Sequence, residues 1–130
     1  MARAVLGRLK RRAEFLRAAA QGSKFSTPGL VLQAIAGNDD QLRVGFTCSK
    51  KVGNAVERNR ARRRLKAAAA TLMPELALVG HDYVLIGKTA TIKRPYALLL
   101  QDLRLALKRV GASRAAEPSA ANPPTEGGSP

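Results

Sequence analysis

The sequence predicts a small α+β domain, a sandwich in which helices pack on one sheet. Three observations carry this prediction: apolar and polar residues alternate along residues 42–49, residues 83–86 are apolar throughout, and helical periodicity occurs before, between and after these stretches. A chain of 130 residues is long enough for one such domain with a core of its own.

The first expected element is a short basic helix at residues 9–20, which read LKRRAEFLRAAA. Its helical periodicity ends at a glycine, as helices often do. The residues before it, 1–8, are expected to form a flexible basic N-terminus. The less polar positions of the helix are Leu9, Phe15, Leu16 and Ala19.

Two strands are expected next, at residues 30–36 and from residue 42 onward. Apolar side chains alternate with polar ones in the second strand, which gives it one buried face and one polar face. The turn-rich segment GNDD lies between the two strands and predicts an antiparallel hairpin. The buried face would carry Leu42, Val44, Phe46 and Cys48, and the polar face Arg43, Gly45, Thr47 and Ser49.

The remaining elements are a strand, a helix and a tail. Residues 83–86, YVLI, suit a strand that is covered on both faces and often paired in parallel. Residues 96–110 predict a helix that begins after Pro95 and ends at Gly111. Residues 112–130 contain too few large apolar residues to fold, so we expect a disordered tail. The apolar side of the helix would be Leu99, Leu103, Ala106 and Val110.

The helix expected between the second and third strands is strongly basic on one side. Asn54 can cap it, with Glu57 reaching back to the cap amide, and Pro74 predicts its end near Leu72. Six of the nine residues in the run RNRARRRLK are Arg or Lys. One narrow stripe is apolar and must face the sheet: Ala61, Leu65, Ala68 and Leu72.

This density of positive charge favours a binding function. Glu57 is the only acid between Lys50 and Lys66, so the arginines lack partners along the helix, and those in the first turns oppose the helix dipole. Guanidinium groups match phosphate geometry. The alternative is a solvated charged face, but 23 Lys and Arg against 9 Asp and Glu, a net charge of +14, favour a nucleic-acid partner. Neither observation distinguishes RNA from DNA.

Composition also bears on location and chemistry. Cys48, the only cysteine, excludes an internal disulfide, predicts the reducing cytoplasm and fits a core position. No apolar run is long enough to span a membrane, and the N-terminus lacks a secretory pattern, although its arginines leave an organelle presequence open. The acids are scattered and the only histidine, His81, has no evident partner. We therefore expect no catalytic group or metal site on the protein, and catalysis by a partner.

The run FTCSKKVGNAVERNRARRRLKAA resembles the signature of the protein component of bacterial ribonuclease P. The segments LKRRAEF, LRVGF and HDYVLIGK and the last helix occur in the same order as in that family, so the resemblance covers about residues 9–111. It implies the element order αβββαβα and a left-handed crossover around the arginine helix. The pattern of this sequence alone predicts only three strands.

The resemblance implies a subunit that binds the catalytic RNA of ribonuclease P and the 5′ leader of precursor tRNA. The holoenzyme is an endoribonuclease that removes the leader; its RNA holds the catalytic groups and requires magnesium, whereas the protein alone binds no cofactor. One protein per RNA is expected, and no membrane. The RNA-binding positions are Lys50, Lys51, Arg58, Asn59, Arg60, Arg62, Arg63 and Lys66, and the leader-binding cleft is formed by Phe15, Gln33, Thr47 and Ser49.

The leader cleft departs from the family pattern at two positions. Many relatives have a second aromatic residue where this chain has Ala19, and tyrosine where it has Gln33, so we expect weaker stacking on the leader. Phe15 could instead belong to the core. The alternative functions are a ribosomal or RNA-chaperone-type protein, which would bind RNA without preferring a leader, and a DNA-binding helix module, which lacks support from helix-turn-helix spacing.

Overall fold

The computed structural model describes residues 6–37 and 41–110. After a first short strand, the elements follow the predicted order αβββαβα, which confirms the expected α+β fold. The turn-rich residues 38–40, the helix exit at Gly111 and the tail at 112–130 lie outside the described residues. The elements are β1 (Leu6–Arg8), α1 (Arg12–Gln21), β2 (Ser23–Ser26), β3 (Leu30–Ala36), β4 (Leu42–Thr47), η1 (Lys50–Val52), α2 (Ala55–Leu76), β5 (His81–Gly87), η2 (Thr89–Ile92) and α3 (Tyr96–Arg109).

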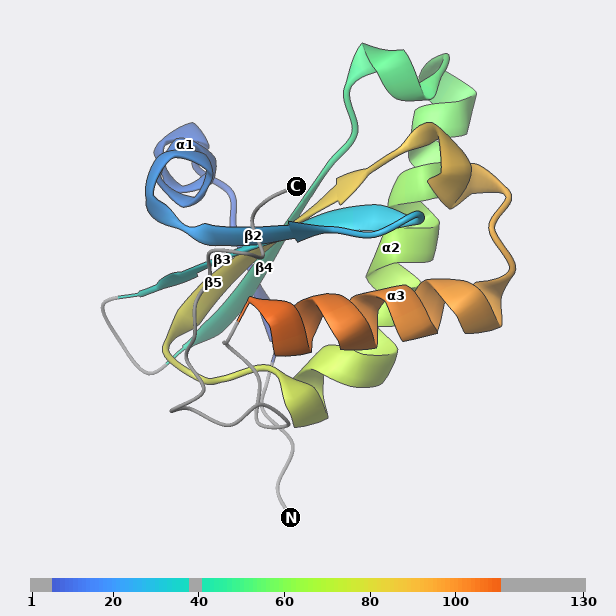
Figure 1. Ribbon diagram of the computed structural model, residues 1–130. Coiled ribbons are helices and arrows are strands. Elements are labelled where there is room, and N and C mark those ends of the chain that lie inside the picture. The colour runs from blue at the N-terminus through green and yellow to red at the C-terminus, as the bar shows by residue number, and fades with distance from the viewer. Residues whose placement is uncertain (1–5, 38–40, 111–130) are drawn as a thin grey trace.

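The strands form one mixed sheet in the order β1-β4-β5-β3-β2. β4 pairs in parallel with both β1 and β5, whereas β3 is antiparallel to β5 and to β2. Helices α2 and α3 lie on one side of the sheet and α1 on the other (Figure 1). No helix among the described residues has the length and apolar character needed to cross a membrane.

The predicted hairpin between β3 and β4 is wrong, because β5 lies between them. Tyr83 in β5 is opposite Val44 of β4 on one side and Ala34 of β3 on the other. β5 is apolar on both faces, and the centre of the sheet is the position in which both faces and both edges of a strand are covered. Burial of β5 therefore outweighs the local turn signal, and the expectation of a covered strand with a parallel partner is confirmed.

The core is divided unequally by the sheet. The larger part fills the space between the sheet, α2 and α3, and includes Leu65, Leu85 and Leu103, none of which is exposed. On the other side, the buried hydrophobic cluster of the described chain is small: it consists of Leu9, Ala18 and Val84, and Phe15, Ile35 and Ile86 pack around it. α1 therefore packs on the sheet through a small apolar contact.

Two predicted boundaries differ from the structure. Residues 6–8 are not part of a flexible N-terminus, because they form β1, which pairs Leu6 with Leu42. This partner is distant in the sequence, and no local pattern reveals it. Helix α2 does not end at Leu72 but continues through Pro74 to Leu76. Met73 and Pro74 are buried in the core, and this packing outweighs the poor helix propensity of proline.

Two further differences concern the beginning of the chain. α1 begins at Arg12 rather than at residue 9, because Leu9 is still tied to the sheet by a hydrogen bond from its amide to the Val44 carbonyl, 3.1 Å long. The strand β2 is not predicted because its sequence, SKFS, is short and polar, and only Phe25 in it is half-buried. Such a strand lies at the sheet edge and has little apolar pattern to show.

Tyr83 predicts a loss of stability at alkaline pH. Burial raises the pKa of Tyr83 from 10.0 to about 12, because the phenolate would lose its hydration. The unfolded chain then releases this proton first, so stability that is complete below pH 10.0 is lost as the pH rises towards about 12. We expect the free energy of unfolding in urea to fall more steeply over this range in the wild type than in Tyr83→Phe. Equal slopes would contradict the assignment.

Candidate nucleic-acid interface

The start of α2 is built as the sequence predicts. The Asn54 Oδ1 accepts a hydrogen bond from the Glu57 amide at 2.8 Å, and the Glu57 Oε1 accepts one from the Asn54 amide at 2.9 Å. Gly53 before the cap has a φ of 152°, and a side chain there would collide with Glu57. This glycine therefore allows η1, which carries Lys50 and Lys51, to sit close against the helix start.

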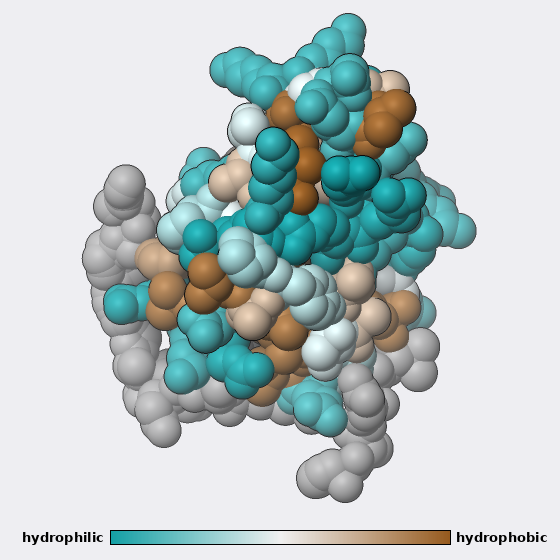
Figure 2. Space-filling model, turned by 90° about the vertical axis from the view of Figure 1, so that its right-hand side faces the viewer, coloured by the Kyte–Doolittle hydropathy of each residue, from teal (hydrophilic) through white to brown (hydrophobic). Residues whose placement is uncertain are grey.

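The predicted RNA-binding residues lie around the exposed side of η1 and α2. The opposite stripe, Ala61, Leu65 and Ala68, is buried against the sheet as predicted. Among the described residues, no acidic side chain forms an ion pair with the basic residues of η1 and α2. Figure 2 shows a largely hydrophilic surface over the upper part of the molecule, where α2 begins. Lys50, Lys51, Asn59, Arg60 and Arg63 are exposed, and Arg58, Arg62 and Lys66 are half-buried. These eight residues are called the α2 surface below.

Arg64 has a different role from its neighbours. Its guanidinium donates hydrogen bonds to the carbonyls of Thr91 and Ile92, each 2.8 Å long, and to the carbonyl of Arg94. Arg94 in turn forms an ion pair with Asp102 of α3. Arg64 therefore ties α2 to the segment that leads from β5 to α3. Its place beside the buried stripe is the sequence signal that sets it apart from the α2 surface.

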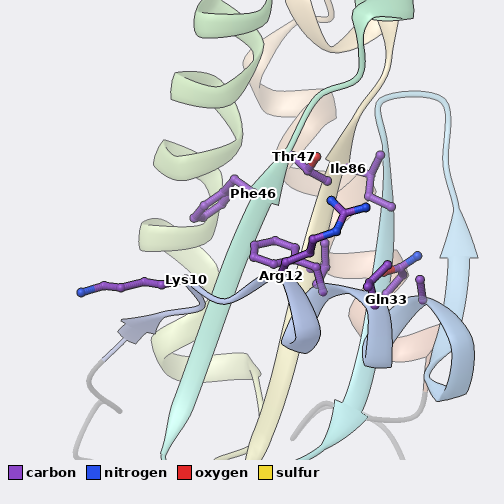
Figure 3. Close-up of a pocket in the computed structure, with 10 residues that line it drawn as sticks. Lys10, Arg12, Gln33, Phe46, Thr47 and Ile86 are labelled. Atoms are coloured by element: carbon purple, nitrogen blue, oxygen red, sulfur yellow. The ribbon is translucent and has the colours of Figure 1, made fainter.

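A cleft of about 460 Å³ lies between α1 and the sheet (Figure 3). It contains three of the four predicted leader-binding residues, Phe15, Gln33 and Thr47. The fourth, Ser49, does not line it. β4 ends at Thr47, so the alternation of faces stops before Ser49, whose hydroxyl instead accepts a hydrogen bond from the Lys51 amide at 3.2 Å. The other lining residues are Lys10, Arg12, Leu16, Ala19, Phe46, Val84 and Ile86.

Phe15 is both a packing residue and a wall of the cleft. Its ring lies so close to Gly45 that a side chain on Gly45 would stand 2.5 Å from the ring carbons. The ring is half-buried in the small cluster that holds α1 on the sheet. Phe15 therefore packs in the small cluster and also lines the cleft, and its stacking on the leader stays a prediction.

Polar groups of the cleft come from α1, from Lys10 just before it, from β3 and from the end of β4. Gln33 is only 6% exposed and still lines the cleft. Lys10 and Arg12 were not among the predicted cleft residues, although Arg12, Phe15 and Ala19 share one helix face by their spacing. In Figure 3, Arg12 lies over the cleft together with Gln33 and Thr47. The cleft thus combines an aromatic face, hydrogen-bonding groups and positive charge.

One end of α1 is fixed to the sheet by polar contacts. Arg43 donates two hydrogen bonds to Asp82, of 3.0 and 3.3 Å, and its guanidinium lies 3.6 Å from Glu14 of α1. Arg17 donates to the Ala36 carbonyl at 3.0 Å. Arg43 and Asp82 lie at the beginning of β4 and β5, whereas Thr47 and Ile86 of the cleft lie near their ends. These polar contacts therefore hold α1 on the sheet without occupying the cleft that α1 lines.

Cys48 and His81 lie outside the cleft lining. Cys48 packs half-buried against the main core, and burial raises the pKa of its thiol, against the opposing effect of Arg62. A neutral thiol in this position fits the predicted core role. His81 is half-buried at the start of β5, and its Nδ1 has no hydrogen-bond partner among the described residues. The described part of the chain contains no group of three His, Cys, Asp or Glu residues placed to hold a metal ion.

Comparison with known proteins identifies the family. A family model described as Ribonuclease P matches residues 5–111. The chain is 59% identical over 127 residues to the ribonuclease P protein component of Paramagnetospirillum magneticum, covering 91% of this chain and 96% of the relative. The chain belongs to the ribonuclease P protein family. The component from Gluconacetobacter diazotrophicus is 53% identical over 105 residues, which cover 80% of this chain and 90% of the relative.

Solved structures of ribonuclease P proteins share the fold. The protein from Staphylococcus aureus superposes with a TM-score of 0.68 at 24% identity, over 82% of this chain and 91% of the other. The protein from Thermotoga maritima gives 0.69 at 22% identity, over 79% and 96%. The family supplies the protein component of ribonuclease P, a metal-dependent ribonucleoprotein endoribonuclease that matures the 5′ end of tRNA, and its partners are the ribonuclease P RNA and precursor tRNA. The family and its function, as predicted, are confirmed.

The different surroundings of Arg64 and Arg63 predict that the same substitution will cost much more stability at Arg64 than at Arg63. Arg64→Ala removes three hydrogen bonds from a charged donor to carbonyls, so we expect the free energy of unfolding to fall by about 3 kcal/mol. Arg63→Ala is the matched control, because Arg63 is exposed and its loss should change stability by less than about 0.5 kcal/mol. Urea denaturation measures both. Equal losses would show that Arg64 is not a tie between α2 and α3.

Proposed function

We propose that this ribonuclease P protein holds the catalytic RNA on its α2 surface and the 5′ leader of precursor tRNA in the cleft beside α1. The observation that carries the proposal is the close connection between the two sites. β4 ends at Thr47, which lines the cleft, and the chain then passes directly into η1 with Lys50 and Lys51. A leader in the cleft would therefore lie next to the RNA that binds the α2 surface.

The α2 surface supplies positive charge where two RNAs must approach each other. Each phosphate that an arginine or lysine neutralises releases counterions, which makes binding stronger and dependent on salt. Arginine also binds phosphate through two parallel hydrogen bonds. The same charges offset part of the repulsion that magnesium, the divalent ion we expect in the holoenzyme, would otherwise screen. We expect one protein per catalytic RNA, acting in the cytoplasm.

The cleft suits a single strand whose sequence varies. The exposed side of the Phe15 ring offers a face on which a base can stack, and any base has such a face. Lys10 and Arg12 place positive charge along the cleft, where it can attract the phosphates of the leader. The Gln33 amide and the Thr47 hydroxyl can form hydrogen bonds to the leader nucleotides. Because Ala19 replaces an aromatic on this face, Phe15 is the stacking residue of α1. Only the precursor has a leader, so these contacts favour precursor over product.

The α2 surface is tested by the magnesium dependence of cleavage. We expect the wild-type protein to restore cleavage at the mature 5′ end by a bacterial ribonuclease P RNA at low magnesium. The double variant Arg62→Ala, Arg63→Ala should need more magnesium and should reduce the slope of log affinity against log salt by about 2, one for each lost phosphate contact. The measurements are cleavage rates across magnesium and RNA affinity across salt concentrations.

The control for this experiment is Arg104→Ala, Lys108→Ala, which removes the same charge from the exposed side of α3. It should leave cleavage and the salt slope nearly unchanged. The same loss in both double variants would mean that total charge, and not the α2 surface, governs binding. RNA binding without any stimulation of cleavage would support the RNA-chaperone alternative.

The cleft is tested by comparing the affinity of the holoenzyme for precursor tRNA with its affinity for mature tRNA. Phe15→Leu keeps an apolar side chain but removes the stacking face, so we expect the holoenzyme to bind precursor about tenfold more weakly and mature tRNA unchanged. Phe25→Leu is the control, because Phe25 is also half-buried but lies in β2, outside the cleft. Equilibrium binding of the two tRNAs measures the effect. An equal loss for precursor and product would refute a leader site at Phe15.

A further inference from the structure

A second, smaller hollow of about 180 Å³ lies between β1 and α2. Its lining residues are Leu6, Gly7, Arg8, Phe46 and Lys66. Leu6 and Phe46 are half-buried and pack against the main core, so they form an apolar floor with an aromatic ring. Arg8 is exposed and Lys66 half-buried, and none of the described residues that line the hollow is acidic. We call it the β1–α2 groove.

The groove continues the α2 surface. Lys66 follows Arg62 by four residues and Asn59 by seven, a spacing that places all three on one side of the helix. The basic row therefore leads directly to the rim of the groove. Arg8 closes the other rim, because it lies two residues after Leu6 in β1 and shares its face.

The groove is also next to an uncovered part of β4. β1 pairs only with residues 42–44 of β4, so Phe46 lies beyond the end of its neighbour strand. Phe46 lines both this groove and the cleft beside α1. In Figure 3 its side chain points from β4 towards α2. Its ring is thus accessible from the α2 side, at the end of the basic row.

We propose that the β1–α2 groove binds one unpaired nucleotide of the catalytic RNA, with its base on Phe46 and Leu6 and its phosphate between Arg8 and Lys66. This inference rests on the proposed function of the α2 surface. The paired cations around an aromatic floor complement a nucleotide, which is both flat and anionic, and do not suit an apolar peptide. Lys66 belongs to the surface proposed for the catalytic RNA, which favours that RNA over the leader as the source of the nucleotide.

The experiment measures binding of the full-length protein to ribonuclease P RNA at several salt concentrations, together with chemical probing of unpaired bases in the RNA. Arg8→Gln should lower the salt slope by about 1. Phe46→Leu should weaken binding about tenfold without changing that slope, because stacking releases no counterion. In both complexes the same single base should become reactive, whereas the wild-type protein protects it.

Two control variants match these changes. Lys24→Gln removes one exposed cation from β2, the strand at the opposite edge of the sheet, and Phe25→Leu shortens a half-buried phenylalanine in the same strand. Neither should alter RNA affinity or base reactivity. Thermal unfolding of every variant shows whether it is folded, and Arg8→Gln, at an exposed residue, keeps the test valid if Phe46→Leu is unstable.

The outcomes separate this inference from the proposed function. Unchanged affinity, slope and base reactivity in Arg8→Gln would overturn the groove as a site while leaving the α2 surface intact. Loss of precursor binding in the holoenzyme, without loss of RNA binding, would also overturn it, since the nucleotide would then belong to the leader. If Arg62→Ala, Arg63→Ala left RNA binding unchanged, the proposed function itself would fail.

Discussion

The burial of β5 on both faces is the constraint on which the rest of the structure depends. A strand of this kind requires the centre of the sheet, where β4 pairs with it in parallel and β3 in antiparallel fashion. Parallel neighbours cannot be joined by a tight turn, so the chain must cross the sheet between them, and α2 is that crossing. The start of α2 is therefore placed at the end of β4, beside the cleft. The nearness of the two proposed RNA sites follows from the position of one apolar strand.

The basic helix has to be stable before RNA arrives, although its charges repel one another. The structure offsets this repulsion at three points: the reciprocal hydrogen bonds of Asn54 and Glu57, the burial of Ala61 and Leu65, and the attachment of Arg64 to three carbonyls. Arg64 thus stabilises the fold, and Arg58 also donates to the Gly53 carbonyl, at 2.9 Å, whereas Arg60 and Arg63 remain exposed. Binding anions would relieve the remaining repulsion, so the charges that lower stability in the free protein are those that favour the complex.

The sequence predicts those features of the fold and the site that depend on spacing within one element. It does not predict features that depend on contacts between segments far apart in the chain. The helix cap, the buried stripe of α2 and the aromatic of α1 follow from spacing within one element, so they could be recognised. β1 could not, because its pairing with Leu42 is not visible in three residues. The hairpin prediction fails for the same reason, since turn signals cannot show that β5 will enter between β3 and β4. Ser49 does not line the cleft because β4 ends at Thr47, so the alternation of faces along this strand does not reach it.

The second half of β4 has a free edge, and the charges beside it explain how that edge is protected. An unpaired strand edge invites pairing with another chain, and proteins protect such edges with charge or with a cover. β1 covers only the first half of β4, and Gly45 to Thr47 have no strand partner on that side among the described residues. Lys10 lies at the cleft side of this edge and Lys66 at the groove side. Positive charge on both sides disfavours a second protein strand, and under the two proposals above the edge left open by a short β1 is where RNA would approach the sheet.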